Sequence, residues 1–203
     1  MEIQEVKRRM HSGEVYICSD PRLTGEQARF QDLMYEYNQT RPSDPQKQQA
    51  LLKQLFAEIG ENTFIQPPFY ANWGGKHVHL GHDVYANFNL TLVDDTHIYV
   101  GDHVLLGPNV TICTATHPID PDSRRRAAEY NLPVRIGNNA WIGGNVFIMP
   151  GVTIGENSVI GAGSLVTRDI PANVVALGSP CRVLREITPE DRETYRNGMK
   201  IDV

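Results

Sequence analysis

Residues 136–171 read IGNNAWIGGNVFIMPGVTIGENSVIGAGSLVTRDIP, and this stretch decides the fold of the chain. A large aliphatic residue recurs there every six positions, at Ile136, Ile142, Ile148, Ile154, Ile160 and Val166. A smaller or branched residue follows each of them four places later, with glycine, asparagine and aspartate between. A fixed period over six units indicates a repeat architecture.

Each six-residue unit suits one short strand followed by a tight turn. A strand this short cannot bury its apolar row alone, so the units must coil and stack, each pairing its backbone with the coil below at about 4.8 Å. Glycine or polar residues at the second to fourth positions supply the positive φ angles of the corners. The sequence therefore predicts a mainly β fold, a parallel β-helix built from hexapeptide repeats.

The repeat extends upstream and is interrupted once. It is recognisable from Leu80, slips by two residues at Ile98 and Tyr99, and resumes until His117. Residues 118–135 (PIDPDSRRRAAEYNLPVR) are charged, punctuated by proline and too irregular for coils. Because long loops on compact folds tend to be functional or disordered, we predict a loop extruded from the helix wall beside His117.

The flanks of the repeat predict helices. Apolar residues at helical spacing mark residues 1–60, where Pro45 suits a helix start and Gly60 a helix end. A second helix start is predicted at Thr188, after the repeat ends near Pro180. We expect a helical cap or arm over 1–60, the β-helix over 61–184 and a short C-terminal helix within the tail 185–203.

Composition limits the classes of function. The 203 residues include 40% hydrophobic residues, enough for one substantial core, and carry a formal net charge of -5, which gives no global basic field for nucleic acid or an anionic membrane. No apolar run approaches the length of a membrane span, and no apolar signal region follows the charged start, so we expect a cytoplasmic protein. The three widely separated cysteines predict free thiols.

The chain resembles the galactoside and maltose O-acetyltransferase family of hexapeptide-repeat acyltransferases over nearly its whole length. The matching segments are the repeat run itself, LMYEYN, ENTFIQPPFYANWG, YANFNLTLVDD, TATHPIDP and GSPCRVLREI. The resemblance implies a left-handed coil, a homotrimer with active sites at subunit interfaces, acetyl-CoA as co-substrate, a small sugar as acceptor and no required metal. It implies no nucleic-acid or membrane partner.

His117 is the first candidate for catalysis. Acetyl transfer from a thioester to an alcohol requires a base near pH 7, where imidazole titrates. The register places His117 at an outward position, and Pro118 biases it toward an extended backbone. The TATHPIDP match implies that His117 is the general base for a sugar hydroxyl, with the 6-hydroxyl expected. A solvent-exposed loop histidine is the alternative.

Candidate acceptor-binding residues also follow from the resemblance. Amide and carboxylate groups can bind sugar hydroxyls directionally, although they are also common at turns. Tyr85 suits stacking on a sugar ring or packing against a neighbouring subunit. An amino-terminal aspartate of the galactoside enzymes aligns here with Cys18, two residues before Asp20. The expected acceptor residues are Asn87, Asp95, Tyr85, Asp20 and Asn72.

The resemblance places the donor in a groove beside the later coils. Small residues allow close backbone approach, amides can stabilise an oxyanion and guanidinium groups match phosphate. Trp141 could line the channel for the pantetheine arm or pack in the trimer. The expected donor residues are Gly144, Ala162, Thr167, Arg168, Arg182, Arg185 and Trp141. The alternative is that the small residues only fit tight coils and the arginines only solvate a terminus.

Several other readings remain open at this point. Cys113 lies four residues before His117 and could carry a covalent acetyl group. A zinc hydratase is considered because His77, His79 and His82 lie close together in sequence. A non-sugar alcohol as acceptor and a non-catalytic solenoid are further alternatives. His97 is expected to stack over His117, and residues 124–126 (RRR) are expected to solvate the extruded loop.

Overall fold

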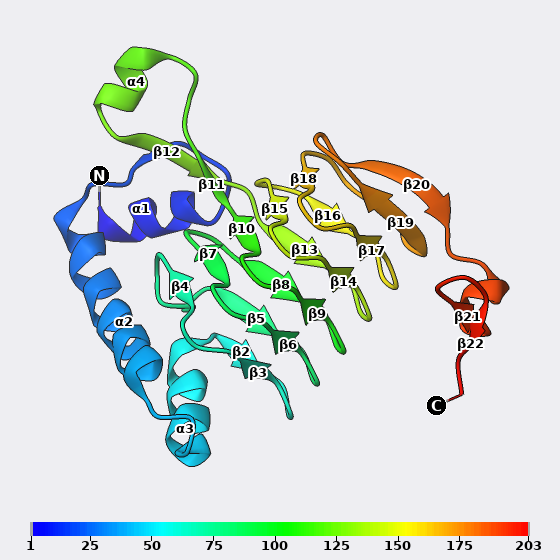
Figure 1. The fold of residues 1–203 in the computed structure, drawn as a ribbon. Coiled ribbons are helices and arrows are strands. Elements are labelled where there is room, and N and C mark those ends of the chain that lie inside the picture. The colour runs from blue at the N-terminus through cyan, green and yellow to red at the C-terminus, as the bar shows by residue number, and fades with distance from the viewer. Residues whose placement is uncertain (1, 203) are drawn as a thin grey trace.

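The fold is a three-sided prism of stacked coils, and the computed structural model describes residues 2–202 of it. The outermost residues of the predicted arm and tail, Met1 and Val203, lie outside the described residues. The chain passes in turn through three sheets of mainly parallel strands, one short strand at a time (Figure 1). The predicted parallel β-helix is thereby confirmed.

Each sheet forms one face of the prism. Face 1 consists of β2 (Glu58–Ile59), β5 (Val78–Leu80), β8 (Ile98–Val100), β13 (Val134–Ile136) and β16 (Thr153–Ile154). Face 2 consists of β3 (Phe64–Ile65), β6 (Tyr85–Ala86), β9 (Leu105–Leu106), β14 (Trp141–Ile142), β17 (Val159–Ile160), β19 (Val174–Leu177) and β20 (Arg182–Glu186). Face 3 consists of β4 (Tyr70–Ala71), β7 (Thr91–Val93), β10 (Thr111–Cys113), β15 (Phe147–Ile148) and β18 (Leu165–Val166).

The sixfold spacing is the step from one face to the next. Ile136, Ile142 and Ile148 lie on faces 1, 2 and 3 of one coil, and all three point into the core. Ile142 lies in register with Leu106 of the coil before and Ile160 of the coil after. Burying one such side chain stabilises the fold by about 1.5–3 kcal/mol, so these columns carry the hydrophobic core along the prism.

The corners explain the glycines and asparagines of the repeat. Asn139 and Asn157, at the fourth position of their units, have φ of 58° and 62°. The Asn157 amide also donates to Asn173 Oδ1 at 2.8 Å in the next coil. Gly137, at the second position, has a different reason: an added Cβ would lie 2.5 Å from the backbone nitrogen of Glu156. The prediction that second-position glycine supplies a positive φ is wrong for Gly137, where the next coil leaves no room for a side chain.

The coils begin earlier than the pattern predicted. The first coil starts at β2, three residues before the expected bound at 61, and its inward residues Ile59, Ile65 and Ala71 are also spaced by six. The two-residue slip lies on face 1, where both Ile98 and Val100 point inward from a three-residue strand.

Three helices precede the prism: α1 (Ile3–Met10), α2 (Pro21–Gln39) and α3 (Pro45–Leu55). Helix α3 starts as predicted, with Pro45 in its first turn and Asp44 accepting from the Lys47 backbone N–H. Its buried face joins the core of the first coil, so α2 and α3 cover that end of the prism (Figure 1). No helix within residues 2–202 is long and apolar enough to cross a membrane.

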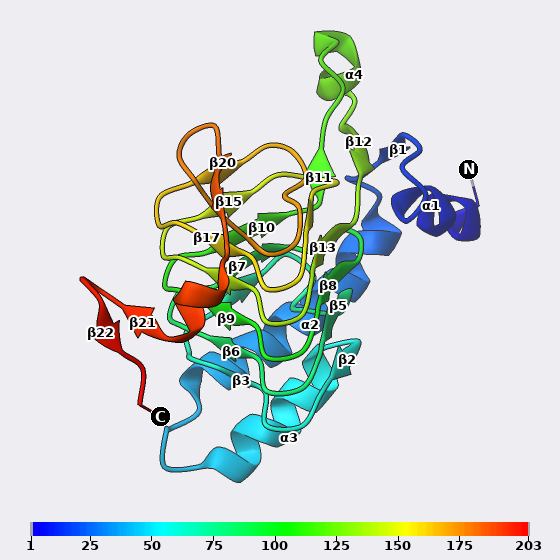
Figure 2. The same cartoon turned by 90° about the vertical axis from the view of Figure 1, so that its right-hand side faces the viewer.

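The predicted extruded loop is an ordered arm. It comprises β11 (Ala115–Thr116), α4 (Pro121–Arg125) and β12 (Ala128–Asn131), and it projects away from the coils (Figures 1 and 2). Strand β12 pairs antiparallel with β11 and with β1 (Tyr16–Ile17). This pairing joins Tyr16 to Glu129, so local sequence patterns could not predict it.

The predicted C-terminal helix is limited to one turn. After β20 pairs antiparallel with β19, a 3₁₀ helix spans Pro189–Arg192, and β21 (Thr194–Tyr195) and β22 (Met199–Lys200) then form a hairpin. Asn197 and Gly198 adopt φ of 60° and 77° in its turn. An Asn-Gly pair favours such hairpin turns, and it overrides the predicted helix here.

Candidate active site

His117 lies at the edge between faces 3 and 1, where the arm leaves the prism. Its Nδ1 is 2.8 Å from the carbonyl oxygen of Ala128. A carbonyl oxygen can only accept, so this contact assigns the ring proton to Nδ1 and leaves the lone pair on Nε2. The side chain is half exposed. His117 therefore presents a basic nitrogen outside the coil, as a general base requires.

Glu129 of the arm faces that nitrogen. Its Oε2 lies 3.9 Å from His117 Nε2, although the Glu129 side chain is only 8% exposed. The Tyr16 hydroxyl donates to the other carboxylate oxygen across the pairing of β1 with β12. Burial, followed by the negative charge of Asp95, raises the pKa of Glu129, while the Tyr16 hydrogen bond opposes that rise. A buried carboxylate is thus held beside His117.

Asp95 is the second carboxylate of the site, and it follows β7 on the same edge. It is buried, and it accepts from Asn72 Nδ2 at 2.8 Å and from Trp73 Nε1 at 3.1 Å. Burial raises the pKa of Asp95, and these donors oppose the rise. The structure therefore brings the predicted residues Asp95 and Asn72 together, with Asn72 orienting the carboxylate.

The amino-terminal segment places Cys18 beside Glu129 and Asp20 at the start of α2. The Cys18 thiol hydrogen bonds to Glu129, and burial raises the pKa of Cys18 to about 11. The Asp20 carboxylate instead caps α2 by accepting from the Arg22 backbone N–H at 3.0 Å, and it pairs with the Arg22 side chain. Among the acceptor residues expected from the sequence, Asp20 therefore lies with the start of α2.

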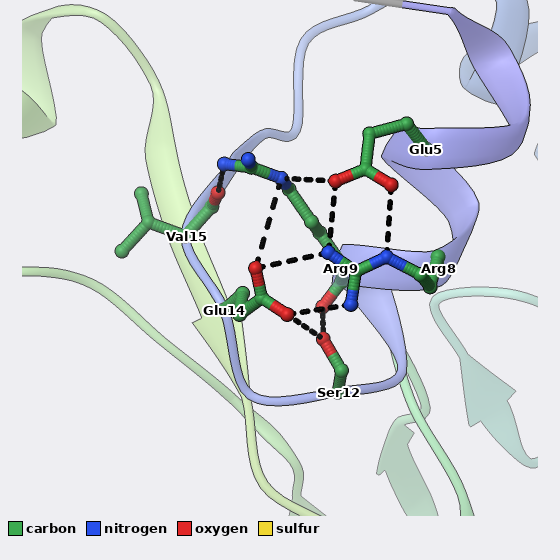
Figure 3. Close-up of polar contacts among 6 residues, drawn as sticks. All are labelled: Glu5, Arg8, Arg9, Ser12, Glu14 and Val15. Atoms are coloured by element: carbon green, nitrogen blue, oxygen red, sulfur yellow. Dashed lines mark hydrogen bonds and ion pairs between the residues drawn. The ribbon is translucent and has the colours of Figure 1, made fainter.

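A surface network fixes the turn that precedes Tyr16 (Figure 3). Arg8 binds Glu5 and Glu14, and Arg9 binds Glu5 and the carbonyl oxygen of Val15. These contacts tie the end of α1 to the residues entering β1. They consequently help to hold the Tyr16 hydroxyl near Glu129.

The remaining predicted residues lie elsewhere on the prism. Asn87, Gly144 and Ala162 follow face 2 at the edge between faces 2 and 3, whereas Thr167 and Arg168 follow face 3, as His117 does. Exposed Tyr85 and Trp141 lie on face 2, in one column through Leu105. Within one chain, Asn87, Gly144 and Ala162 thus lie at one edge and His117, Thr167 and Arg168 at another, with face 3 between the two edges.

The two arginines expected near the donor phosphates lie on β20, and both are exposed. The Arg185 guanidinium forms a two-pronged contact with Asp191, at 2.7 and 2.8 Å. Arg182 donates to the carbonyl oxygen of Cys181 at 2.7 Å.

The positions of His97 and of the cysteines bear on several of the alternatives left by the sequence. His97 lies against His79, with 2.9 Å between ring nitrogens, so the expected stacking over His117 is wrong. The chain leaves the prism at β11, so the coil that follows His97 on face 1 begins at Val134, whose backbone N–H donates to the His97 carbonyl at 3.2 Å. Burial raises the pKa of Cys113, whose thiol contacts the Ala115 carbonyl. All three cysteines are free, as predicted.

The three histidines considered for zinc make separate contacts. His77 contacts the Asp94 carbonyl, His79 contacts Glu58 and His97, and His82 accepts from the Glu61 backbone N–H. Within residues 2–202, no three His, Cys, Asp or Glu side chains are grouped to hold a metal ion. Arg124 and Arg125 bind carbonyls and Asp122 within the arm.

Glu129 and Tyr16 were missed by the sequence reasoning. Glu129 lies in the interruption, outside every repeat, and Tyr16 lies in a segment without a strong pattern. The resemblance to TATHPIDP ended before Glu129, so no local signal marked it. Their pairing across β1 and β12 requires the folded chain.

Comparisons with known proteins agree with this geometry. The family described as maltose acetyltransferase hexapeptide capping motif matches residues 9–60, and bacterial transferase hexapeptide (six repeats) matches residues 133–168. A galactoside O-acetyltransferase of Lactococcus lactis subsp. lactis (strain IL1403) is 58% identical over 199 residues, covering 98% of this chain and 96% of that protein.

Two solved structures extend the comparison. A galactoside acetyltransferase in complex with coenzyme A superposes with a TM-score of 0.93 and 46% identity, covering 100% of both chains. A hexapeptide-repeat acetyltransferase from Vibrio cholerae O1 biovar eltor, complexed with acetyl coenzyme A, has a TM-score of 0.82 and 34% identity, covering 89% of this chain and 97% of that one.

Proposed function

Because the chain belongs to the galactoside and maltose O-acetyltransferase family and is a sugar O-acetyltransferase with acetyl-CoA as co-substrate, we propose its reaction in more detail. It transfers acetyl to the 6-hydroxyl of a galactoside, of maltose or glucose, or of a related sugar. The observation that carries the proposal is the His117 ring at the outer edge, with Nδ1 held by the Ala128 carbonyl and Nε2 facing the buried Glu129 carboxylate.

The transfer is direct, within a complex of enzyme, acetyl-CoA and acceptor. His117 Nε2 takes the proton of the acceptor hydroxyl as its oxygen attacks the thioester carbonyl, and a backbone amide stabilises the oxyanion. The thiolate of coenzyme A then leaves, and the proton on His117 can neutralise it. The raised pKa of Cys113 supports this route over an acetylated cysteine, because the thiolate is the nucleophile.

The donor residues fit acetyl-CoA by their chemistry. Gly144 and Ala162 allow close approach at one edge, and the Trp141 side chain is 52% exposed beside them on face 2. Arg182 and Arg185 offer guanidinium groups that match phosphate. Thr167 and Arg168 serve the pantetheine arm from the other edge.

The division between two edges supports a homotrimer with active sites at its subunit interfaces. One copy would supply His117, Asp95 and Asn72, and its neighbour would supply Asn87 and Gly144. Face 2 offers a packing surface, since Tyr85, Leu105 and Trp141 form an exposed apolar column there. We also propose that the trimer is cytoplasmic.

A panel of acceptors tests the proposal. Release of coenzyme A thiol is measured with galactosides, maltose, glucose and a simple non-sugar primary alcohol, and NMR of the product locates the acetyl group. The proposal predicts sugar-dependent release and acetylation at position 6. Equal release with the non-sugar alcohol, or acetylation only at a ring hydroxyl, would refute the assigned acceptor.

A further inference from the structure

We propose that Glu129 is a positioning residue for the base: its buried carboxylate stabilises the positive charge that His117 acquires when it takes the acceptor proton. The inference rests on the proposed function of His117 and adds a second residue to it. It arises from the arm, which lies outside the repeats and which the reaction as proposed above does not use.

The two nitrogens of the His117 ring have different partners. Nδ1 donates to the Ala128 carbonyl, and the adjacent residue, Glu129, places Oε2 3.9 Å from Nε2. Two consecutive residues of β12 thus face the two sides of one imidazole. The first fixes the tautomer, and the second faces the atom that receives the proton.

The charge is effective because it is held out of water. Glu129 is 6% exposed, and its position is fixed by the Tyr16 hydroxyl, which also accepts from Asn131 Nδ2 at 3.1 Å. Opposite charges about 4 Å apart attract several times more strongly near a protein interior than in bulk water. A carboxylate so placed favours the imidazolium.

Other titratable groups around Glu129 also affect its charge. Asp95 faces it from the end of β7, Cys18 and Tyr16 from the segment of β1, His117 from the end of β11, and Cys113 from β10. Asp95 is already engaged by Asn72 and Trp73. Glu129 Oε2 lies 3.9 Å from Nε2, which makes Glu129 the partner of the imidazolium.

The test is Glu129→Gln, which keeps the shape and an acceptor for Tyr16 but removes the charge. We expect kcat to fall about 10- to 100-fold with the KM for acetyl-CoA unchanged. We also expect the acid limb of the kcat/KM profile to move to lower pH, because an imidazolium without its carboxylate loses its proton more readily.

Glu58→Gln is the matched control. Glu58 also pairs with a histidine, His79, at 3.0 Å, but on face 1 and away from the arm. This substitution should leave kcat and the pH profile unchanged. If Glu129→Gln does not fold, Glu129→Met supplies a second uncharged side chain of similar length.

The outcomes are distinct. A lowered kcat with an unmoved acid limb would mean a structural role for Glu129 and would overturn the inference, while wild-type kinetics in Glu129→Gln would do the same. If the wild-type enzyme acetylates no sugar, the proposed function fails instead. NMR titration of the His117 ring then still decides the inference, because the midpoint must fall in Glu129→Gln and not in Glu58→Gln.

Discussion

Acid should weaken the packing of His77 behind the acceptor site. His77 is 6% exposed, and its Nδ1 contacts the Asp94 carbonyl at 2.7 Å. Burial lowers the pKa of His77 from 6.5 to about 3. Because the folded pKa lies below the unfolded one, the contribution is fully present above pH 6.5 and is lost as the pH falls toward 3. Between pH 7.5 and pH 5 this amounts to about 2 kcal/mol of unfolding free energy.

The neighbouring Asp94 carboxyl changes the stability with pH in the opposite direction, so its contribution must be separated from that of His77. Burial raises the pKa of Asp94 from 3.8 to about 7, so this carboxyl makes the fold more stable as the pH falls through that range. The two effects nearly cancel in the wild-type protein. His77→Asn keeps an N–H donor for the Asp94 carbonyl but does not titrate. The difference between the two proteins therefore isolates His77.

Urea unfolding of both proteins at pH 7.5 and pH 5, at equal chain concentration, measures this difference. The stability advantage of the wild-type protein over His77→Asn should shrink by about 2 kcal/mol on going to pH 5. Any loss of unfolding free energy that removal of the His77 ring causes equally at both pH values cancels in that comparison. Identical pH dependence in the two proteins would refute the reasoning.

Substitutions at three further positions test the fold and the tail. Ile142 is fully buried between two coils, so Ile142→Ala should lower the free energy of unfolding by about 2–5 kcal/mol and Ile142→Val by about 0.5–1.5 kcal/mol. Equal losses for the two variants in urea unfolding would contradict this packing. Asn157→Ala should be less stable than Asn157→Gly, since φ is 62° there, and the reverse order would contradict the corner argument. Asp191→Asn should lower the KM for acetyl-CoA about twofold by releasing Arg185, and an unchanged KM would count against phosphate binding by Arg185.

The repeat could be predicted from sequence because its cause is local. The chain takes six residues to pass from one face to the next, which is the spacing of Ile136, Ile142 and Ile148. Each unit also carries its own corner residues. The first coil was harder to recognise, since the unit of Ile65 contains Pro67 and Pro68 where later units have glycine and asparagine. The helix start at Thr188 was predicted correctly, but the helix is one 3₁₀ turn long because the Asn197-Gly198 turn favours a hairpin in the residues that follow.

The candidate site was only partly predictable, for a physical reason. His117 and Asp95 lie in or beside repeats, so the register could orient them. Glu129 meets them through an antiparallel pairing with Tyr16, and the sequence separation of that pair carries no periodic signal. His97 was placed wrongly because the chain leaves the prism at β11, so that Val134 and not His117 follows it in the next coil.

In the proposed reaction, His117 takes the proton of the acceptor hydroxyl during acetyl transfer. The direct measurement compares His117→Ala with wild type in steady-state acetylation of the preferred sugar, with acetyl-CoA binding measured by calorimetry on the same samples. We expect kcat to fall by about 10²- to 10⁴-fold while the Kd for acetyl-CoA stays within about twofold. Wild-type turnover in His117→Ala would contradict it.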